Sequence, residues 1–202
     1  MSGITPSQTV GPFFAYGLTP NGKYDWVDTF SNNLITPDAS GERIHVRGRV
    51  FDADDKPIPD CMIEIWQADA QGRYANPADQ RSLPNAKFTG FGRCGADDNG
   101  DYSFDTIKPG PYPWRNHHNA WRPAHIHFSV FGHSFLSRLV TQMYFPGDPL
   151  FPFDPIYNSV SDEKARERMV SSFDLENTIP EWALCFRFDM VLRGRNQTPM
   201  EK

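Results

Sequence analysis

The stretch RIHVRGRVF, residues 43–51, decides the fold class because apolar and polar side chains alternate along it. Ile44, Val46 and Val50 all fall on the even-numbered positions of this stretch. A period of two is typical of a half-buried β-strand, whose successive side chains point to opposite faces of the sheet. We therefore expect ordered β-structure to begin here, with His45 on the polar face as a surface histidine.

Similar short segments follow along the chain, separated by turn residues. The predicted strands are 61–69, 88–94, 102–107, 124–132, 137–145 and 183–192. An Asn-Gly turn predicts that 88–94 and 102–107 form a hairpin. A single helix is expected after Ser161 as N-cap, with apolar residues at spacing four. Many short strands and little helix predict an all-β fold, an antiparallel β-sandwich with long loops, an extended N-terminal arm and one short helix.

Length and composition predict one domain over residues 1–202, with 1–42 as arm and loop and 43–193 as the sandwich core. The net charge of −5 argues against a nucleic-acid partner, and no apolar run is long enough to span a membrane. The N-terminus lacks the features of a signal peptide. The odd number of cysteines, three without a CxxC motif, favours reduced thiols and a cytoplasmic protein.

Residues 110–128, GPYPWRNHHNAWRPAHIHF, contain four of the six histidines. In a strand, His125 and His127 would project from the same face, which is half of a site for Fe, Zn, Cu or Ni. The alternative is a polar strand edge or a satisfied core pair. Tyr112 strengthens the metal hypothesis, because a tyrosine oxygen suits ferric iron. Arg122 could place a permanent positive charge beside an anionic substrate.

The chain resembles the intradiol ring-cleavage dioxygenases over nearly its whole length. The resemblance is carried by GPYPWRN…WRPAHIHF together with IEIWQADAQGRY, GFGRC, YSFDTIKPG and VTQMYFPGD. It implies a β-sandwich that holds a non-haem Fe(III) through two tyrosines and two histidines. The implied reaction, part of the β-ketoadipate pathway of aromatic catabolism, cleaves protocatechuate with O2 to 3-carboxy-cis,cis-muconate. Members that resemble this chain most are built from homologous alpha and beta chains, of which beta binds the iron.

Two features favour the alpha chain. The N-terminal segment TPSQTVGPFF resembles alpha chains, and residues 75–88 contain no tyrosine where a beta chain is expected to carry its first ligand. Tyr74, in the Gly-Arg-Tyr motif, is not counted as a ligand position. Tyr112, His125 and His127 then match three of the four ligand positions. The resemblance therefore implies an incomplete site here, Fe(III) in a beta partner, an inactive lone chain and a higher alpha/beta oligomer.

The resemblance also assigns roles to other side chains. Arg122 and Gln142 match positions beside the iron, vestigial in this chain. The expected substrate-contacting residues are Thr9, Gly11, Pro12 and Phe13 of the arm, together with Trp114 and His133. Two alternatives stay open, namely a self-sufficient catechol-type dioxygenase that binds its own iron, and a non-catalytic β-sandwich scaffold.

Overall fold

The computed structural model describes residues 31–37, 39–75, 88–114, 120–132 and 138–200. The arm residues Thr9, Gly11, Pro12 and Phe13 lie outside these ranges, as does His133. Their expected contacts with substrate therefore stay predictions, as do the boundaries of the N-terminal arm.

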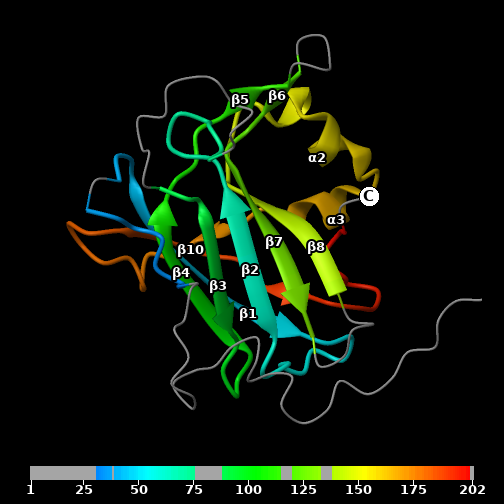
Figure 1. The fold of residues 1–202 in the computed structure, drawn as a ribbon. Helices are drawn as coiled ribbons and strands as arrows, with labels where there is room; N and C mark the ends of the chain where they lie inside the picture. Colours follow the sequence, from blue (N-terminus) through cyan, green and yellow to red (C-terminus); the bar gives the residue numbers. More distant parts are fainter. Residues whose placement is uncertain (1–30, 38, 76–87, 115–119, 133–137, 201–202) are drawn as a thin grey trace, which may run out of the picture.

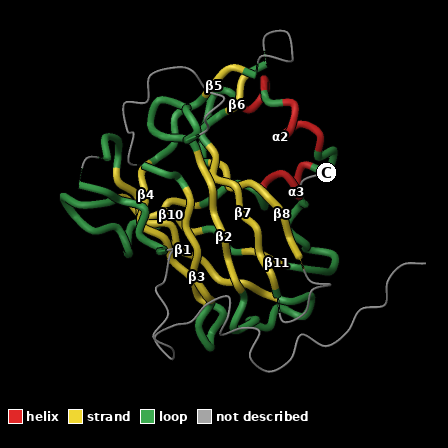
Figure 2. The backbone as a smooth tube through the Cα atoms, viewed as in Figure 1, coloured by secondary structure: helices red, strands yellow, loops and turns green. Residues whose placement is uncertain are grey.

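Two sheets form the body of the molecule (Figures 1 and 2). The first contains β1 (Arg43–Phe51), β4 (Asp101–Ile107), β9 (Ser172–Phe173), β10 (Leu184–Arg187) and β11 (Met190–Val191). The second has the order β3 (Phe91–Gly95), β2 (Met62–Gln67), β7 (His125–Phe131) and β8 (Arg138–Tyr144). A short pair, β5 (Tyr112–Pro113) with β6 (Trp121–Arg122), lies beyond one end of the sheets in Figure 1.

The hydrophobic core lies between the two sheets and confirms the predicted sandwich. The alternation in β1 leaves Ile44, Val46 and Val50 with no exposed surface. Across the layers, the ring of Phe128 on β7 meets that of Phe104 on β4 edge to face, with centroids 6.4 Å apart. Burying one face of each sheet in this way is what a period-two pattern favours.

The sheets are not purely antiparallel. β1 pairs antiparallel with β4, but parallel with both β10 and β11. The predicted strand 183–192 forms two short strands, β10 and β11, which pair with successive parts of β1. This segment returns from the far end of the sequence, so no tight turn fixes its direction.

The predicted hairpin of 88–94 with 102–107 is wrong in its pairing. The turn exists, since the amide of Gly100 donates a hydrogen bond of 2.9 Å to the carbonyl of Asp97. The strands on either side of it enter different sheets, because β3 pairs with β2 whereas β4 pairs with β1. The turn crosses from one layer of the sandwich to the other.

The helices of the described residues lie beyond β8 (Figure 1). The predicted helix is present as α3 (Glu163–Glu167), but its N-cap is Asp162, which accepts from the amide of Lys164, and not Ser161. A second helix, α2 (Pro155–Ser159), and the 3-10 turn η1 (Phe151–Phe153) occupy a segment predicted as loop. None of the helices in the described ranges is long and apolar enough to cross a membrane.

Candidate metal centre

Strand β7 supplies the two histidines, both on the same face as predicted. The His127 ring stacks on Trp66 of the neighbouring strand, with centroids 4.8 Å apart and planes 4° from parallel. His125 is buried, and its Nδ1 lies 2.7 Å from the carbonyl oxygen of Pro123. Pro123 and Trp66 thus hold the two rings, and neither contact uses an Nε2 atom.

The carbonyl of Pro123 selects the chemical form of His125. A carbonyl only accepts, so Nδ1 must carry the proton, and the neutral ring then has its lone pair on Nε2. Burial lowers the pKa of His125 well below its usual range, and its neighbours Arg122 and His127 add to this effect. Neutral imidazole with a lone pair on Nε2 is the form that binds a metal ion.

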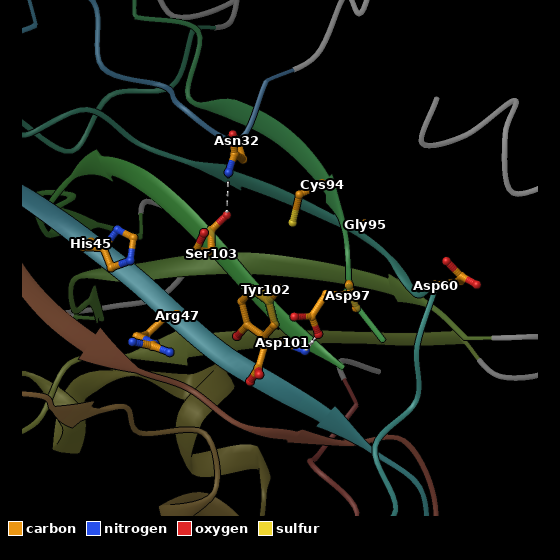
Figure 3. Close-up of a pocket in the computed structure, with 11 residues that line it drawn as sticks. Asn32, His45, Arg47, Asp60, Cys94, Gly95, Asp97, Asp101, Tyr102 and Ser103 are labelled. Atoms are coloured by element: carbon orange, nitrogen blue, oxygen red, sulfur yellow. Dashed lines mark hydrogen bonds between the residues drawn. The ribbon is translucent and has the colours of Figure 1, made fainter. Parts of the chain in front are cut away.

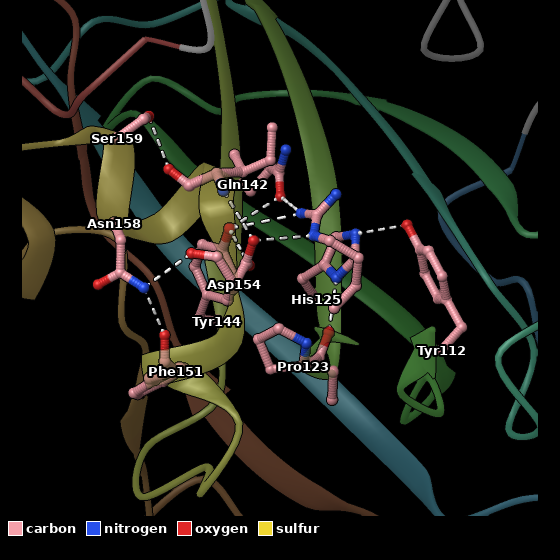
Figure 4. Close-up of polar contacts among 12 residues, drawn as sticks. Tyr112, Pro123, His125, Gln142, Tyr144, Phe151, Asp154, Asn158 and Ser159 are labelled. Carbon is pink, nitrogen blue, oxygen red and sulfur yellow. Dashed lines mark hydrogen bonds and ion pairs between the residues drawn. The ribbon is translucent and has the colours of Figure 1, made fainter. Parts of the chain in front are cut away.

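Tyr112 joins the two histidines, as the sequence predicted. It lies on β5, directly opposite Arg122 of β6, and its hydroxyl is 3.4 Å from Nε2 of His125. Figure 4 shows this contact together with the one from His125 to Pro123. The flanking prolines fix the backbone around Tyr112, which limits the directions that its side chain can take.

A fourth side chain, Tyr74, also lies in the cluster, for which the sequence predicted only three residues. Its hydroxyl lies 3.1 Å from Nε2 of His127, 3.5 Å from Nε2 of His125 and 3.5 Å from the hydroxyl of Tyr112. The family resemblance placed the fourth oxygen within residues 75–88 and did not count Tyr74. Tyr74 is the residue just before that loop.

Close backbone packing brings the Tyr74 loop to Tyr112. Gly72 has a left-handed φ of +71°, and a Cβ there would lie 2.3 Å from the carbonyl oxygen of Pro111. Gly110 is equally crowded, because a Cβ at that position would lie 2.4 Å from the carbonyl oxygen of Ala70. Only glycine permits such an approach of two backbones. In the sequence, Gly72, two residues before Tyr74, was therefore the signal that Tyr74 could approach Tyr112.

Asp69 fixes the turn that precedes Tyr74. Its buried carboxylate accepts hydrogen bonds from the amides of Gln71 (2.9 Å) and Arg73 (3.0 Å). Its carbonyl oxygen accepts from the amides of Gly72 and Gly110. One residue thus shapes the turn before Tyr74 and ties it to the segment that leads to Tyr112.

The four donor atoms fit a metal ion. Four donors placed tetrahedrally about 2.1 Å from one centre lie roughly 3.4 Å from each other. Four separations within the cluster are 3.1, 3.4, 3.5 and 3.5 Å. Two phenolic oxygens and two imidazole nitrogens are a donor set suited to ferric iron. In the described part of the chain, no three His, Cys, Asp or Glu side chains gather into a separate metal site.

Arg122 and Gln142 lie beside the cluster, in one buried network. Arg122 donates to Oε1 of Gln142, and its Nε lies 3.1 Å from Oδ1 of Asp154. Burial alone opposes the charge of Arg122, but Asp154, Tyr144 and Tyr112 raise its pKa above the usual value. Figure 4 shows Gln142, Tyr144 and Asp154 grouped on the side of His125 away from Tyr112.

Trp114 also lies near this network. The guanidinium carbon of Arg122 is 5.6 Å from the centroid of its indole ring, within the range of a cation–π contact. The sequence predicted both residues near the site, and the structure brings them together. The Asp154 carboxylate was not predicted there.

A cavity of about 580 Å³ lies on another part of the molecule, lined by residues that include parts of β1, β3 and β4 (Figure 3). His45 and Arg47 of β1 line it, and Nδ1 of His45 is 2.7 Å from the carboxylate of Asp105. His45, which was predicted to be a surface histidine, is partly exposed and pairs with Asp105. The cavity includes none of the four donors.

The cysteines are free thiols, as predicted. Cys61 and Cys185 are buried and Cys94 is half-buried. Burial raises the pKa of Cys61 to about 12, that of Cys94 to about 12 and that of Cys185 to about 11. Such thiols stay protonated at neutral pH and are poor nucleophiles.

Comparison with known proteins points to one family. The family model described as "Dioxygenase" (Dioxygenase_C) matches residues 11–194. The protocatechuate 3,4-dioxygenase beta chain of Burkholderia cepacia is 52% identical over 188 residues, which cover 93% of this chain and 79% of that protein. The alpha chain of the same enzyme is 34% identical, covering 96% and 94%. The solved dioxygenase domain of a carbohydrate-binding fusion protein from Streptomyces sp. SirexAA-E is 26% identical, with a TM-score of 0.58 and coverage of 94% and 98%.

Proposed function

We propose, from the premise that this chain belongs to the intradiol ring-cleaving dioxygenase family, that it is an iron-bearing chain that cleaves protocatechuate. The observation that carries the proposal is the position of the Tyr74 hydroxyl, 3.1 Å from Nε2 of His127. With it the chain offers a complete set of two tyrosines and two histidines. The expectation of iron in a partner rested on a missing fourth ligand and on an alpha-like N-terminal segment, and the position of the Tyr74 oxygen argues against the first of these reasons.

Tyr74, Tyr112, His125 and His127 would hold the Fe(III). When bound, the ion supplies a Lewis acid that activates a catecholate towards O2. The carbon–carbon bond between the two hydroxyl-bearing carbons breaks, and both oxygen atoms of O2 enter the product, 3-carboxy-cis,cis-muconate.

The residues of this chain then have separate tasks. The Pro123 carbonyl keeps Nε2 of His125 unprotonated, and the stack on Trp66 keeps the His127 ring in place. Beside a bound Fe(III), Tyr74 and Tyr112 would favour the phenolate form, and such a phenolate could accept a proton from a catechol hydroxyl. Arg122 stays protonated beside Asp154 and lies near His125, where its guanidinium would stabilise negative charge that develops on the ring oxygens during the reaction.

The 52% identical beta chain supports the iron-bearing role more than the two alpha chains, which are 34% and 31% identical. That these relatives are named as alpha and beta chains also supports assembly with a homologous chain. We propose that the active form is such an oligomer, in which this chain contributes the iron. The arm residues Thr9 to Phe13 are then proposed to contact substrate in their own or a neighbouring subunit.

Purification of this chain alone, followed by iron counting and a visible spectrum, tests the proposal. We expect close to one iron per chain and a coloured band from tyrosinate-to-iron charge transfer. Turnover of protocatechuate, and of catechol as comparison, is then measured with O2 consumption. A lone chain that takes up no iron and is colourless would return the iron to a partner and contradict the proposal.

The Tyr74→Phe variant tests the fourth ligand directly. It removes only the hydroxyl oxygen, so we expect the charge-transfer band to weaken. Turnover should fall by roughly 100-fold or more, because loss of a residue that only supports a ligand already costs roughly 10- to 100-fold. Tyr157→Phe is the matched control, since Tyr157 lies on α2 with its ring stacked on Phe151. An unchanged spectrum in Tyr74→Phe would mean that only three side chains bind the ion.

A further inference from the structure

We propose that Asp154 is a positioning residue that holds Arg122 beside the metal cluster and compensates its charge, so that Arg122 itself adds little preference for anionic over neutral ring substituents. This inference rests on the proposed function for its role in turnover. Its physical basis is a buried carboxylate at a position where the sequence predicted only loop.

The burial and contacts of Asp154 are unusual for a loop residue. It has no exposed surface, and Oδ1 lies 3.1 Å from Nε of Arg122, whose side chain is also buried. Two opposite charges shielded from water interact far more strongly than a surface pair. An Arg122 side chain without this partner would leave a buried positive charge uncompensated.

Tyr144 connects Asp154 to β8, the strand that pairs with the His125 strand β7. Its hydroxyl lies 3.1 Å from Oδ2 of Asp154 and 3.0 Å from Oε1 of Gln142, so its single proton is shared between two acceptors. Nη2 of Arg122 donates to the same Gln142 oxygen. Arg122 is therefore fixed from two sides, by a charged group and by an amide, and both contact Tyr144.

The position of Arg122 gives this arrangement its consequence. Arg122 is directly opposite Tyr112 in the β5–β6 pair and precedes His125 by three residues. A ring bound at the cluster would therefore lie close to the guanidinium. Because Asp154 cancels much of that positive charge, a carboxylate on the ring gains little from it.

The helix cap provides a way to change only the charge. Oδ1 of Asp154 also accepts from the amide of Ile156 and caps α2 (2.8 Å). Asparagine caps helices about as well as aspartate. Asp154→Asn therefore keeps the acceptor and the shape while removing the negative charge.

The test compares wild type, Asp154→Asn and Asp162→Asn. Asp162 caps α3 through the amide of Lys164 (3.1 Å) and is the matched control. Calorimetry measures the affinities of 4-hydroxybenzoate and of its neutral counterpart 4-hydroxybenzamide, with no turnover required. We expect the benzoate-to-benzamide affinity ratio to rise roughly three- to tenfold in Asp154→Asn, and to stay unchanged in Asp162→Asn. In turnover assays Asp154→Asn should lower kcat roughly tenfold while retaining iron.

Two results would overturn the inference. One is an affinity ratio in Asp154→Asn equal to that of wild type, and the other is an equal change in Asp162→Asn. The double variant Arg122→Gln/Asp154→Asn removes both charges and should bring the ratio back to the wild-type value or below. Because the affinity ratio needs no turnover, it tests Asp154 even if wild type cleaves no catechol, a result that would contradict only the proposed function.

Discussion

The two halves of the metal cluster are held in different ways. His125 and His127 lie on one strand, in the middle of a hydrogen-bonded sheet, and their spacing alone places them on one face. Tyr74 and Tyr112 come from a loop and a two-residue strand, and reach the histidines because backbones pack closely at Gly72 and Gly110. The histidine half is therefore fixed by local geometry, whereas the tyrosine half depends on contacts between distant segments.

Removing a side chain from the histidine half should give the largest loss of activity. His127→Ala removes a nitrogen ligand, and we expect loss of iron and a fall in turnover of roughly a thousandfold, equivalent to several kcal/mol of transition-state stabilisation. His45→Ala is the matched control, since His45 is also a strand histidine but pairs with Asp105. Iron content and O2 consumption are the measurements. Iron retained at the wild-type level in His127→Ala would exclude this residue as a ligand.

The tyrosine half can be disrupted without substituting either tyrosine. Gly72→Ala places a Cβ against the carbonyl of Pro111 and should displace Tyr74, weakening the charge-transfer band. The left-handed backbone alone should cost about 1–2 kcal/mol of unfolding free energy, and the clash adds to it. Gly147→Ala is the control, because Gly147 has a similar φ of +74° but no atom within 4 Å of a Cβ.

Thermal unfolding and the visible spectrum separate the two glycine variants. We expect both to lose stability, and only Gly72→Ala to lose colour. Equal spectra would show that the loop can adapt without moving the Tyr74 oxygen, and the two halves of the cluster would then differ less than their contacts indicate.

The smallest effect is expected in the first sheet, away from both halves. A hydrogen bond from Arg49 lowers the pKa of Asp101 below its ordinary value near 4. A depressed carboxyl pKa stabilises the fold above the unfolded-state value, and this contribution is lost as the pH falls through the folded-state value. Asp101→Asn should therefore lower Tm slightly at pH 7, and the difference from wild type should vanish on acidification. Iron content should not change, and a variant with altered iron content would link this sheet to the cluster.

The same contrast explains what could be predicted from the sequence. Strands β1, β2, β7 and β8 follow from alternating apolar residues, and the His125–His127 pair follows from its place in β7. The fourth ligand candidate was missed because the family motif directed attention to residues 75–88. The close approach of Gly72 to Pro111 that brings Tyr74 into place joins residues distant in sequence.

The errors in strand pairing have a similar cause. The Asn-Gly turn between β3 and β4 is a strong local signal for a hairpin, but each strand pairs with a different, longer-range neighbour. Asp154 was missed for the same reason. Its role depends on a buried arginine more than thirty residues earlier in the sequence, a separation that no local pattern reports.

The parallel pairing of β1 with β10 and β11 has a consequence for biosynthesis. Ile44 emerges from the ribosome long before its partner Leu184. Until then, β1 presents an unpaired edge, which is a template for aggregation. Pairings between such distant segments also slow folding. The first sheet can therefore close only after β10 and β11 have been synthesised, and conditions that delay the release of these two strands should lower the yield of soluble protein.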